Sequence, residues 1–192
     1  MVSELTATKR PSAAADKLLR TARKLFATEG IRAVGIDRIV AEASVAKATL
    51  YQNFHSKDGL IVAYLSAQDL EDRERYTKHV ATEQDPASRA LAFFDLAQAG
   101  AAAREYRGCA FLNAATEFPG HTHPVSEVVV DHRRWMHGLL TAAADDLGHR
   151  NPAAIADQLV VLYDGGVAGS KVTRDETPIK VARELAAQIL QP

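Results

Sequence analysis

The sequence predicts an all-α fold of about nine helices, with an N-terminal three-helix helix-turn-helix domain followed by a larger helical domain. Alanine-rich segments with apolar residues at helical spacing run through most of the 192 residues. No segment alternates apolar and polar residues as a half-buried strand would. Hydrophobic residues make up 47% and charged residues 24% of the chain, which is typical of a globular protein.

The first domain is predicted over residues 1–57, beginning with a polar arm at 1–11. Its helices are expected at about 12–28, 36–43 and 47–54. Ser12 has a hydroxyl suited to an N-cap of the first helix, and Gly30 suits a left-handed residue that terminates it. The second and third helices are close in sequence, so they must be joined by a tight turn.

The second domain is predicted over residues 58–192. Its helices, the first of which begins at the boundary, are expected at about 56–80, 86–106, 109–117, 125–147, 153–172 and 177–190. Pro86 and Pro178 fit the first turn of a helix, where the missing N–H is not needed. The apolar positions of the last two helices recur at helical spacing and form stripes.

Charge is divided unevenly along the chain, although the net charge is only −1. Residues 1–60 contain ten Lys and Arg against six Asp and Glu, a balance of +4. Residues 61–192 contain thirteen against eighteen, a balance of −5. A basic first part attracts phosphate and an acidic remainder repels it, so a nucleic acid is expected to meet the first part only.

Several classes of protein are not expected. A single cysteine, Cys109, excludes an intrachain disulfide, and no apolar run approaches the roughly 20 residues that span a membrane. The N-terminus lacks the apolar core of a signal peptide, so we expect a cytoplasmic protein. No Cys, His and carboxylate set has metal-ligand spacing, and no phosphate loop, nucleophile elbow or carboxylate pair is present, so we expect no metal, no cofactor and no enzyme.

Residues 34–57 are the most informative part of the chain, because they predict two short helices joined by a turn. The second helix buries Leu50 and Phe54 on its inner side. Its outer side presents the polar and aromatic side chains of Lys47, Thr49, Tyr51, Gln52 and Asn53. A helix that presents such a surface fits the major groove of DNA.

Many positions of residues 18–65 agree with one family at fixed spacing. These are Leu25-Phe26-Ala27, Gly30, Ile36-Asp37-Arg38-Ile39, Ala43, Val45, Lys47, Thr49-Leu50-Tyr51, Phe54, Ser56-Lys57 and Leu60. In these positions the chain resembles the TetR family of transcriptional regulators. Beyond residue 65 the resemblance is one of architecture, except that Gly108-Cys109-Ala110-Phe111-Leu112-Asn113 with Glu117 resembles the ligand domains of some members.

The resemblance implies a set of DNA-binding residues: Gly35, Lys47, Ala48, Thr49, Tyr51, Gln52, Asn53 and Lys57. It places the Tyr51 hydroxyl, Asn53 and Lys57 against backbone phosphates, and Lys47 and Thr49 where side chains reach bases or flanking phosphates. Gln52 is the best candidate for reading a base, because its amide pairs with adenine.

The chain departs from the family pattern at three positions. It has Ser44 where the turn usually carries Gly, Ala46 before the recognition helix instead of Ser or Thr, and Gly35 where helix 2 often begins with Thr or Ser. The last two changes remove capping hydroxyls, which weakens helix caps or phosphate contacts without threatening the fold.

The last two helices are the expected surface of a homodimer, since a helical regulator needs a partner to span two half-sites on DNA. Their apolar stripes contain Ile155, Leu159, Leu162, Val167 and Val172 in one helix, and Val181, Leu185, Ile189 and Leu190 in the other. The alternative is that these side chains only cover the core of the monomer.

A small apolar ligand is expected to bind among the middle helices. The candidate ligand-binding residues are the large apolar Tyr64, Phe93, Phe94, Phe111, Trp135 and Met136, with the polar Asn113 and Glu117; His132 and His137 are further polar candidates. Aromatic residues at helical spacing are also common in a plain core, and this alternative stays open for each of them.

Together these features predict a homodimeric repressor that a small apolar ligand releases from a palindromic operator. One alternative is a helical small-molecule-binding protein or enzyme that does not act on DNA. Another is a regulator that senses thiol chemistry through Cys109, if Arg104 or Arg107 stabilises its thiolate; a small buried hydrophobe is the plainer interpretation of that cysteine.

Overall fold

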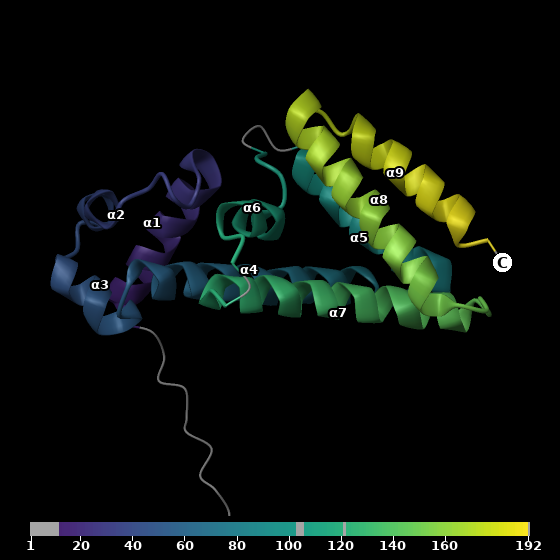
Figure 1. Ribbon diagram of the computed structural model, residues 1–192, viewed down its shortest axis with the longest axis horizontal. Coiled ribbons are helices and arrows are strands. Elements are labelled where there is room, and N and C mark those ends of the chain that lie inside the picture. The colour runs from purple at the N-terminus through teal and green to yellow at the C-terminus, as the bar shows by residue number, and fades with distance from the viewer. Residues whose placement is uncertain (1–11, 103–105, 121, 192) are drawn as a thin grey trace, which may run out of the picture. The chain divides into compact units, whose positions relative to one another are not determined.

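A computed structural model describes residues 12–102, 106–120 and 122–191, which fold into nine α-helices (Figure 1). The predicted all-α fold is therefore confirmed. The polar arm predicted at 1–11 lies outside the described residues. None of the helices in the described ranges has an apolar stretch long enough to cross a membrane.

The helices divide into two compact units, of which the first extends to Tyr64 and the second begins at Leu65. The division falls inside a helix, whereas the predicted domain boundary between residues 57 and 58 lies at that helix's first turn. The first unit contains α1 (Ala13–Glu29), α2 (Ile36–Ala43), α3 (Lys47–Phe54) and the first part of α4 (Lys57–His79).

The ends of α1 form as the sequence predicts. The Ala15 amide donates to the Ser12 hydroxyl at 3.1 Å, so Ser12 is the N-cap. Gly30 follows the helix with φ at 94°, and its amide donates to the Phe26 carbonyl at 3.1 Å. The buried side of α1 packs Phe26 edge-to-face on Tyr64 of α4, with ring centroids 5.5 Å apart.

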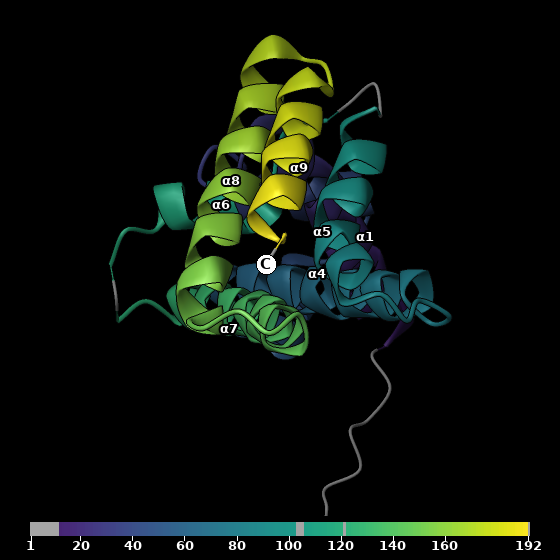
Figure 2. The same ribbon diagram turned by 90° about the vertical axis from the view of Figure 1, so that its right-hand side faces the viewer.

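The second unit contains the rest of α4 and five further helices. These are α5 (Pro86–Ala101), α6 (Ala110–Glu117), α7 (Pro124–Asp146), α8 (Pro152–Thr173) and α9 (Thr177–Ile189). Helices α8 and α9 run antiparallel beside each other, and α5 packs against both and against α7 (Figures 1 and 2). The core between these helices is apolar, with Phe94, Met136, Leu140, Leu159 and Ile179 among its fully or almost fully buried side chains.

The helix predicted over 86–106 is shorter than expected. Helix α5 ends at Ala101, and residues 106–109 are not helical. Gly100 lies in its last turn, where glycine is about 1 kcal/mol less favourable than alanine. Because alanines surround Gly100, the sequence predicted a helix that continues to residue 106, but the helix ends at Ala101.

A buried histidine joins three helices of the second unit. His132 of α7 is only 4% exposed, and its Nδ1 lies 2.7 Å from Oδ1 of Asp69 in α4. The other oxygen of Asp69 accepts from Nε of Arg73 at 2.7 Å. The imidazole stacks on Phe111 of α6, with centroids 3.6 Å apart. Burial lowers the pKa of His132, because the cation is poorly solvated there, and the hydrogen bond to Asp69 opposes this effect only in part.

This arrangement predicts an acid-dependent loss of stability. The folded protein binds fewer protons at His132 than the unfolded chain does, so the free energy of unfolding decreases as the pH falls through the pKa of the unfolded residue. His132→Gln, which keeps a donor for Asp69, is expected to reduce the difference in stability between about pH 7 and about pH 5, as measured by urea unfolding.

His137→Gln is the matched control, since His137 lies on the same helix but pairs with the exposed Asp157 at 3.0 Å. This variant is expected to keep the acid dependence of the wild type. If His132→Gln lost as much stability between about pH 7 and about pH 5 as the wild type does, His132 would not be the source of the acid dependence.

Candidate DNA-binding surface

Helices α2 and α3 are joined by a turn in which one residue is left-handed. Ser44 has φ of 51° and ψ of 48°, and the Val45 amide donates to the Val40 carbonyl at 3.1 Å. A residue other than glycine in this conformation is strained by roughly 1 kcal/mol. Ser44 therefore adopts the turn for which glycine is better suited, and the α2–α3 geometry is kept despite this departure from the family pattern.

The recognition helix α3 is held by one fully buried side chain, that of Leu50. Most of the residues predicted to bind DNA are exposed: Gly35, Lys47, Ala48, Tyr51, Gln52 and Asn53; Thr49 and Lys57 are half-buried. Gly35 and Ala46 precede α2 and α3 without a side-chain cap. The side chains of the predicted residues are thus mainly accessible to a partner.

Lys47 forms an ion pair across the turn between α2 and α3. Its Nζ lies 2.7 Å from Oδ1 of Asp37, near the start of α2. The hydrogen bond to Asp37 raises the pKa of Lys47 above its ordinary value, because it favours the charged ammonium. Spacing in sequence gives no sign of this pair, since the two residues lie on different helices on either side of the turn.

Two other predicted DNA contacts also form bonds within the first unit. The Asn53 amide nitrogen donates to the Thr49 carbonyl at 2.7 Å, and its oxygen accepts from the Ser12 hydroxyl at 3.3 Å. The Lys57 ammonium donates to the Arg32 carbonyl at 3.2 Å. These bonds fix the direction of both side chains before any partner binds.

The end of α3 approaches the start of α4 very closely. His55 has φ of 63° and ψ of −34°, and the Ser56 amide donates to the Phe54 carbonyl at 2.7 Å, which makes a strained γ-turn. The Ser56 hydroxyl then accepts from the Gly59 amide at 3.0 Å and caps α4. A Cβ on Gly59 would lie 2.0 Å from the Phe54 carbonyl oxygen, so only glycine fits.

Comparison with known proteins identifies this architecture. The family model for bacterial regulatory proteins of the tetR family matches residues 18–64. A second family model, for the tetracyclin repressor-like C-terminal domain, matches residues 86–186. The chain belongs to the TetR family. It is therefore a helix-turn-helix transcriptional regulator that binds DNA, and not an enzyme.

Relatives of this TetR-family regulator cover nearly its whole length. SCO4454, a TetR-family transcriptional regulator from Streptomyces coelicolor, is 36% identical, with a TM-score of 0.87 over 92% of this chain and 94% of that one. A putative TetR transcriptional regulator from Streptomyces avermitilis is 25% identical, with a TM-score of 0.74 over 91% and 98%. The HTH-type transcriptional regulator YjdC of Escherichia coli is 23% identical over 92% of this chain and 93% of its own length.

Three of the aromatic residues predicted to bind a small molecule belong to one group of ring contacts in the second unit, in which Trp135 contacts Phe93 and also His132, on which Phe111 stacks. Phe93 stacks on Tyr76 with centroids 4.5 Å apart, and the edge of Trp135 meets Phe93 at 5.5 Å. Phe94 packs edge-to-face on Tyr163 at 5.8 Å. Tyr76 and Tyr163, which were not among the predicted residues, gain these aromatic neighbours only in the fold, because each stands alone in its segment.

Tyr64 lies in the first unit, whereas Phe111 joins the rings around Trp135 through His132. Tyr64 packs on Phe26 inside the first unit, so its ring contributes to the core of the DNA-binding part. Phe111 stacks on His132 in the second unit, where His132 in turn pairs with Asp69.

The remaining candidates are tied to charged side chains or lie at a helix end. The Asn113 oxygen accepts from Lys171 Nζ at 2.7 Å, and its nitrogen donates to the Arg107 carbonyl at 3.0 Å. The Met136 sulfur accepts from the Arg133 guanidinium at 3.7 Å. Glu117 is the last residue of α6 and is half-buried.

Cys109 does not have the surroundings of a reactive thiol. Burial raises the pKa of the thiol, and the backbone amides of Leu112 and Phe111 together with the Arg133 guanidinium oppose this only in part. Redox-sensitive cysteines have lowered pKa values, so this position disfavours the thiol-sensor alternative. Of the cations that the sequence suggested, Arg104 lies outside the described residues.

The contact at Gly59 predicts that the first unit does not accept a methyl group there. Gly59→Ala places the new carbon against a backbone oxygen, so α3 or α4 must shift, and we expect a loss of about 1–3 kcal/mol in the free energy of unfolding. Urea unfolding measures this loss. Gly138→Ala in α7 is the control, because its Cβ meets nothing within 4 Å, and we expect a gain of about 0.5–1 kcal/mol. Equal stability of Gly59→Ala and the wild type would contradict the close approach.

Proposed function

We propose that this regulator is a homodimeric repressor, in which the α3 helices of two copies bind the half-sites of a palindromic operator. A small apolar molecule bound in the second unit changes the spacing of the two α3 helices and releases the DNA. A coupling of about 1–3 kcal/mol between the two sites changes operator occupancy by about 5–150-fold.

The observation that carries the DNA-binding part is the surface of α3. An eight-residue helix buries Leu50 and leaves Lys47, Tyr51 and Gln52 exposed. The +4 balance of residues 1–60 favours phosphate on this part of the chain, whereas the remainder is acidic. Lysines and the Tyr51 hydroxyl suit the DNA backbone, while Gln52 suits a base edge.

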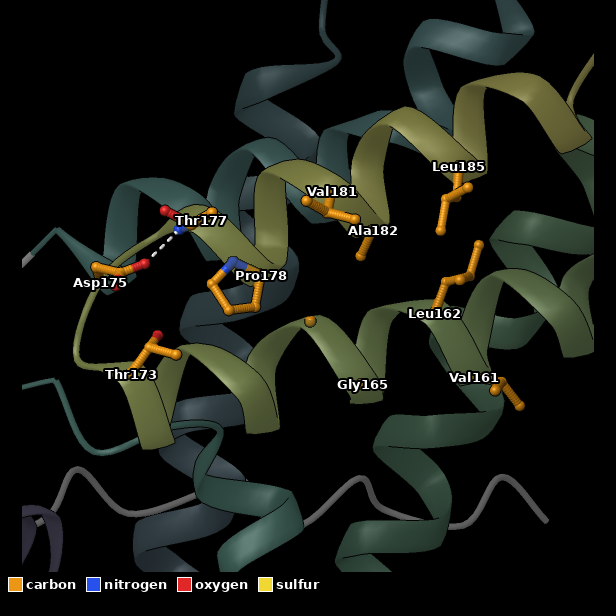
Figure 3. A pocket seen from close by; sticks show the side chains of 11 residues that line it. Val161, Leu162, Gly165, Thr173, Asp175, Thr177, Pro178, Val181, Ala182 and Leu185 are labelled. Atoms are coloured by element: carbon orange, nitrogen blue, oxygen red, sulfur yellow. Dashed lines mark hydrogen bonds between the residues drawn. The ribbon is translucent and has the colours of Figure 1, made fainter.

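The exposed apolar faces of α8 and α9 support a dimer. Val161, Val172, Val181 and Leu185 are 42–81% exposed, although apolar residues of this size are usually covered. A groove of about 490 Å³ lies between the two helices, and Leu162 and Leu185 point towards each other across it (Figure 3). Because a two-fold interface uses the same patch twice, a second copy of these helices supplies a matching apolar surface.

The aromatic interior of the second unit supports the effector part of the proposal. Phe93, Trp135, Phe111 and Met136 place large apolar groups near charged partners, which is the composition of small-molecule sites. Helix α4 connects this region to Lys57, at the start of the same helix, so a shift of α4 on ligand binding is the simplest route to the DNA surface.

Two variants test the division between backbone and base contacts. Lys57→Gln is expected to weaken binding to all duplexes and to reduce the slope of log K against log salt by about one, because one phosphate contact is lost. Gln52→Ala is expected to keep the slope but to relax the choice of base at one position, by about 1–3 kcal/mol. Titrations against a duplex selected by the wild type from random DNA, and against its single-base variants, measure both effects.

Lys78→Gln is the control for charge, since Lys78 is an exposed lysine at the far end of α4. It removes the same charge and is expected to change neither quantity. A wild type that binds no duplex in a salt-dependent manner would contradict the proposal, as would a Lys57→Gln variant that binds like Lys78→Gln.

The dimer surface gives a separate test. Val181→Lys places a charge on the exposed face of α9, and we expect the protein to become monomeric and to lose affinity for a duplex with two half-sites. Val130→Lys on α7 is the matched control, because Val130 is 51% exposed and Val181 is 50% exposed. Sedimentation velocity measures the mass. A dimeric Val181→Lys, or a monomeric Val130→Lys, would contradict an interface through α8 and α9.

A further inference from the structure

A carboxylate lies beside the first cation of the recognition helix. Oδ1 of Asp37 is 2.7 Å from Nζ of Lys47, and both side chains are mainly exposed to solvent. Asp37 is the second residue of α2 and Lys47 is the first of α3, so the pair bridges the two helices of the helix-turn-helix. An acidic group at this place opposes binding of phosphate to the surface that is proposed to meet DNA, because like charges repel.

The start of α3 is otherwise favourable for an anion. The preceding residue, Ala46, supplies no side-chain cap, and no acidic residue occupies the first turn of the helix. Amide groups at a helix N-terminus and a lysine ammonium both attract phosphate. Oδ1 of Asp37 already lies at hydrogen-bond distance from that ammonium, in a position that a phosphate oxygen would take.

We propose that Asp37 is an internal competitor for DNA phosphate at Lys47 and thereby sets the strength and the salt dependence of DNA binding. The inference rests on the proposed DNA-binding role of α3. For Lys47 to contact a phosphate, its ammonium must leave the Asp37 carboxylate or divide its hydrogen bonds between the carboxylate and the phosphate. In either case the negative charge of Asp37 lies close to the phosphate and is less fully compensated. The wild-type protein consequently binds DNA less tightly than the count of its cations implies, and fewer counterions are released.

Asp37→Asn tests the proposal, because asparagine keeps the size of the side chain and removes its charge. We expect affinity for duplex DNA to rise about five-fold at low salt, and the slope of log K against log salt to become steeper by about one. The probe is a duplex selected by the wild type from random DNA, with a scrambled duplex of the same composition alongside it. Urea unfolding of each variant shows whether the fold is kept.

Glu42→Gln is the matched control. It removes the same charge from the same helix, but Glu42 pairs with Nε of Arg38 at 3.2 Å instead of with Lys47. A general electrostatic effect would change binding equally in both variants, whereas the proposal requires the larger change in Asp37→Asn.

A double-variant cycle isolates the pair itself. In a Lys47→Gln background, Asp37→Asn is expected to change affinity no more than Glu42→Gln does, because no ammonium remains to be released. The same gain in both backgrounds would overturn the inference. So would a loss of affinity in Asp37→Asn, which would instead indicate a carboxylate that accepts a hydrogen bond from a base such as cytosine.

The experiments distinguish a failure of this inference from a failure of the proposed function. If the wild type itself binds no duplex, the DNA-binding role of α3 fails and the competitor fails with it. If the wild type binds in a salt-dependent manner and Asp37→Asn behaves like Glu42→Gln, only the role of Asp37 is overturned.

Discussion

The DNA-binding surface depends on contacts that hold a helix too short to be stable alone. Helix α3 has eight residues and buries one of them completely, Leu50, whereas isolated helices shorter than about 12–15 residues are marginal in water. Its end is fixed by the close approach of Gly59 to the Phe54 carbonyl, and its start by the pair between Lys47 and Asp37. The side chains proposed to face DNA are therefore positioned partly by residues outside α3, among them Asp37 and Gly59.

The second unit combines a packed interior with an uncovered face. His132 links α4, α6 and α7 through its contacts with Asp69 and Phe111, so the helices around the proposed effector region are joined by a polar contact as well as by apolar packing. Helices α8 and α9 leave valines and a leucine exposed, and a second copy of the chain would cover them. His132 is thus buried by packing within one chain, whereas Val181 is exposed in one chain and would be covered in the proposed dimer.

Local signals predicted most of the fold, and contacts between distant residues account for the rest. Ser12, Gly30 and the prolines at helix starts marked helix ends correctly, because caps act within one turn. The end of α5 at Ala101 was missed, since alanine-rich sequence gives no sign of where a helix stops. Of the five residues expected on the outer side of α3, four are exposed and Thr49 is half-buried. The Asp37 pair and the Ser12–Asn53 bond could not be predicted, because each depends on how two helices are oriented.

Amide hydrogen exchange with and without a selected duplex tests most directly whether DNA binds to the helix-turn-helix of the first unit. We expect slower exchange over α2, α3 and the first turns of α4 when the duplex is bound, with the strongest protection near Leu50, and no comparable change in α8 and α9. Protection confined to the second unit, or no change in α3 at saturating duplex, would contradict the account.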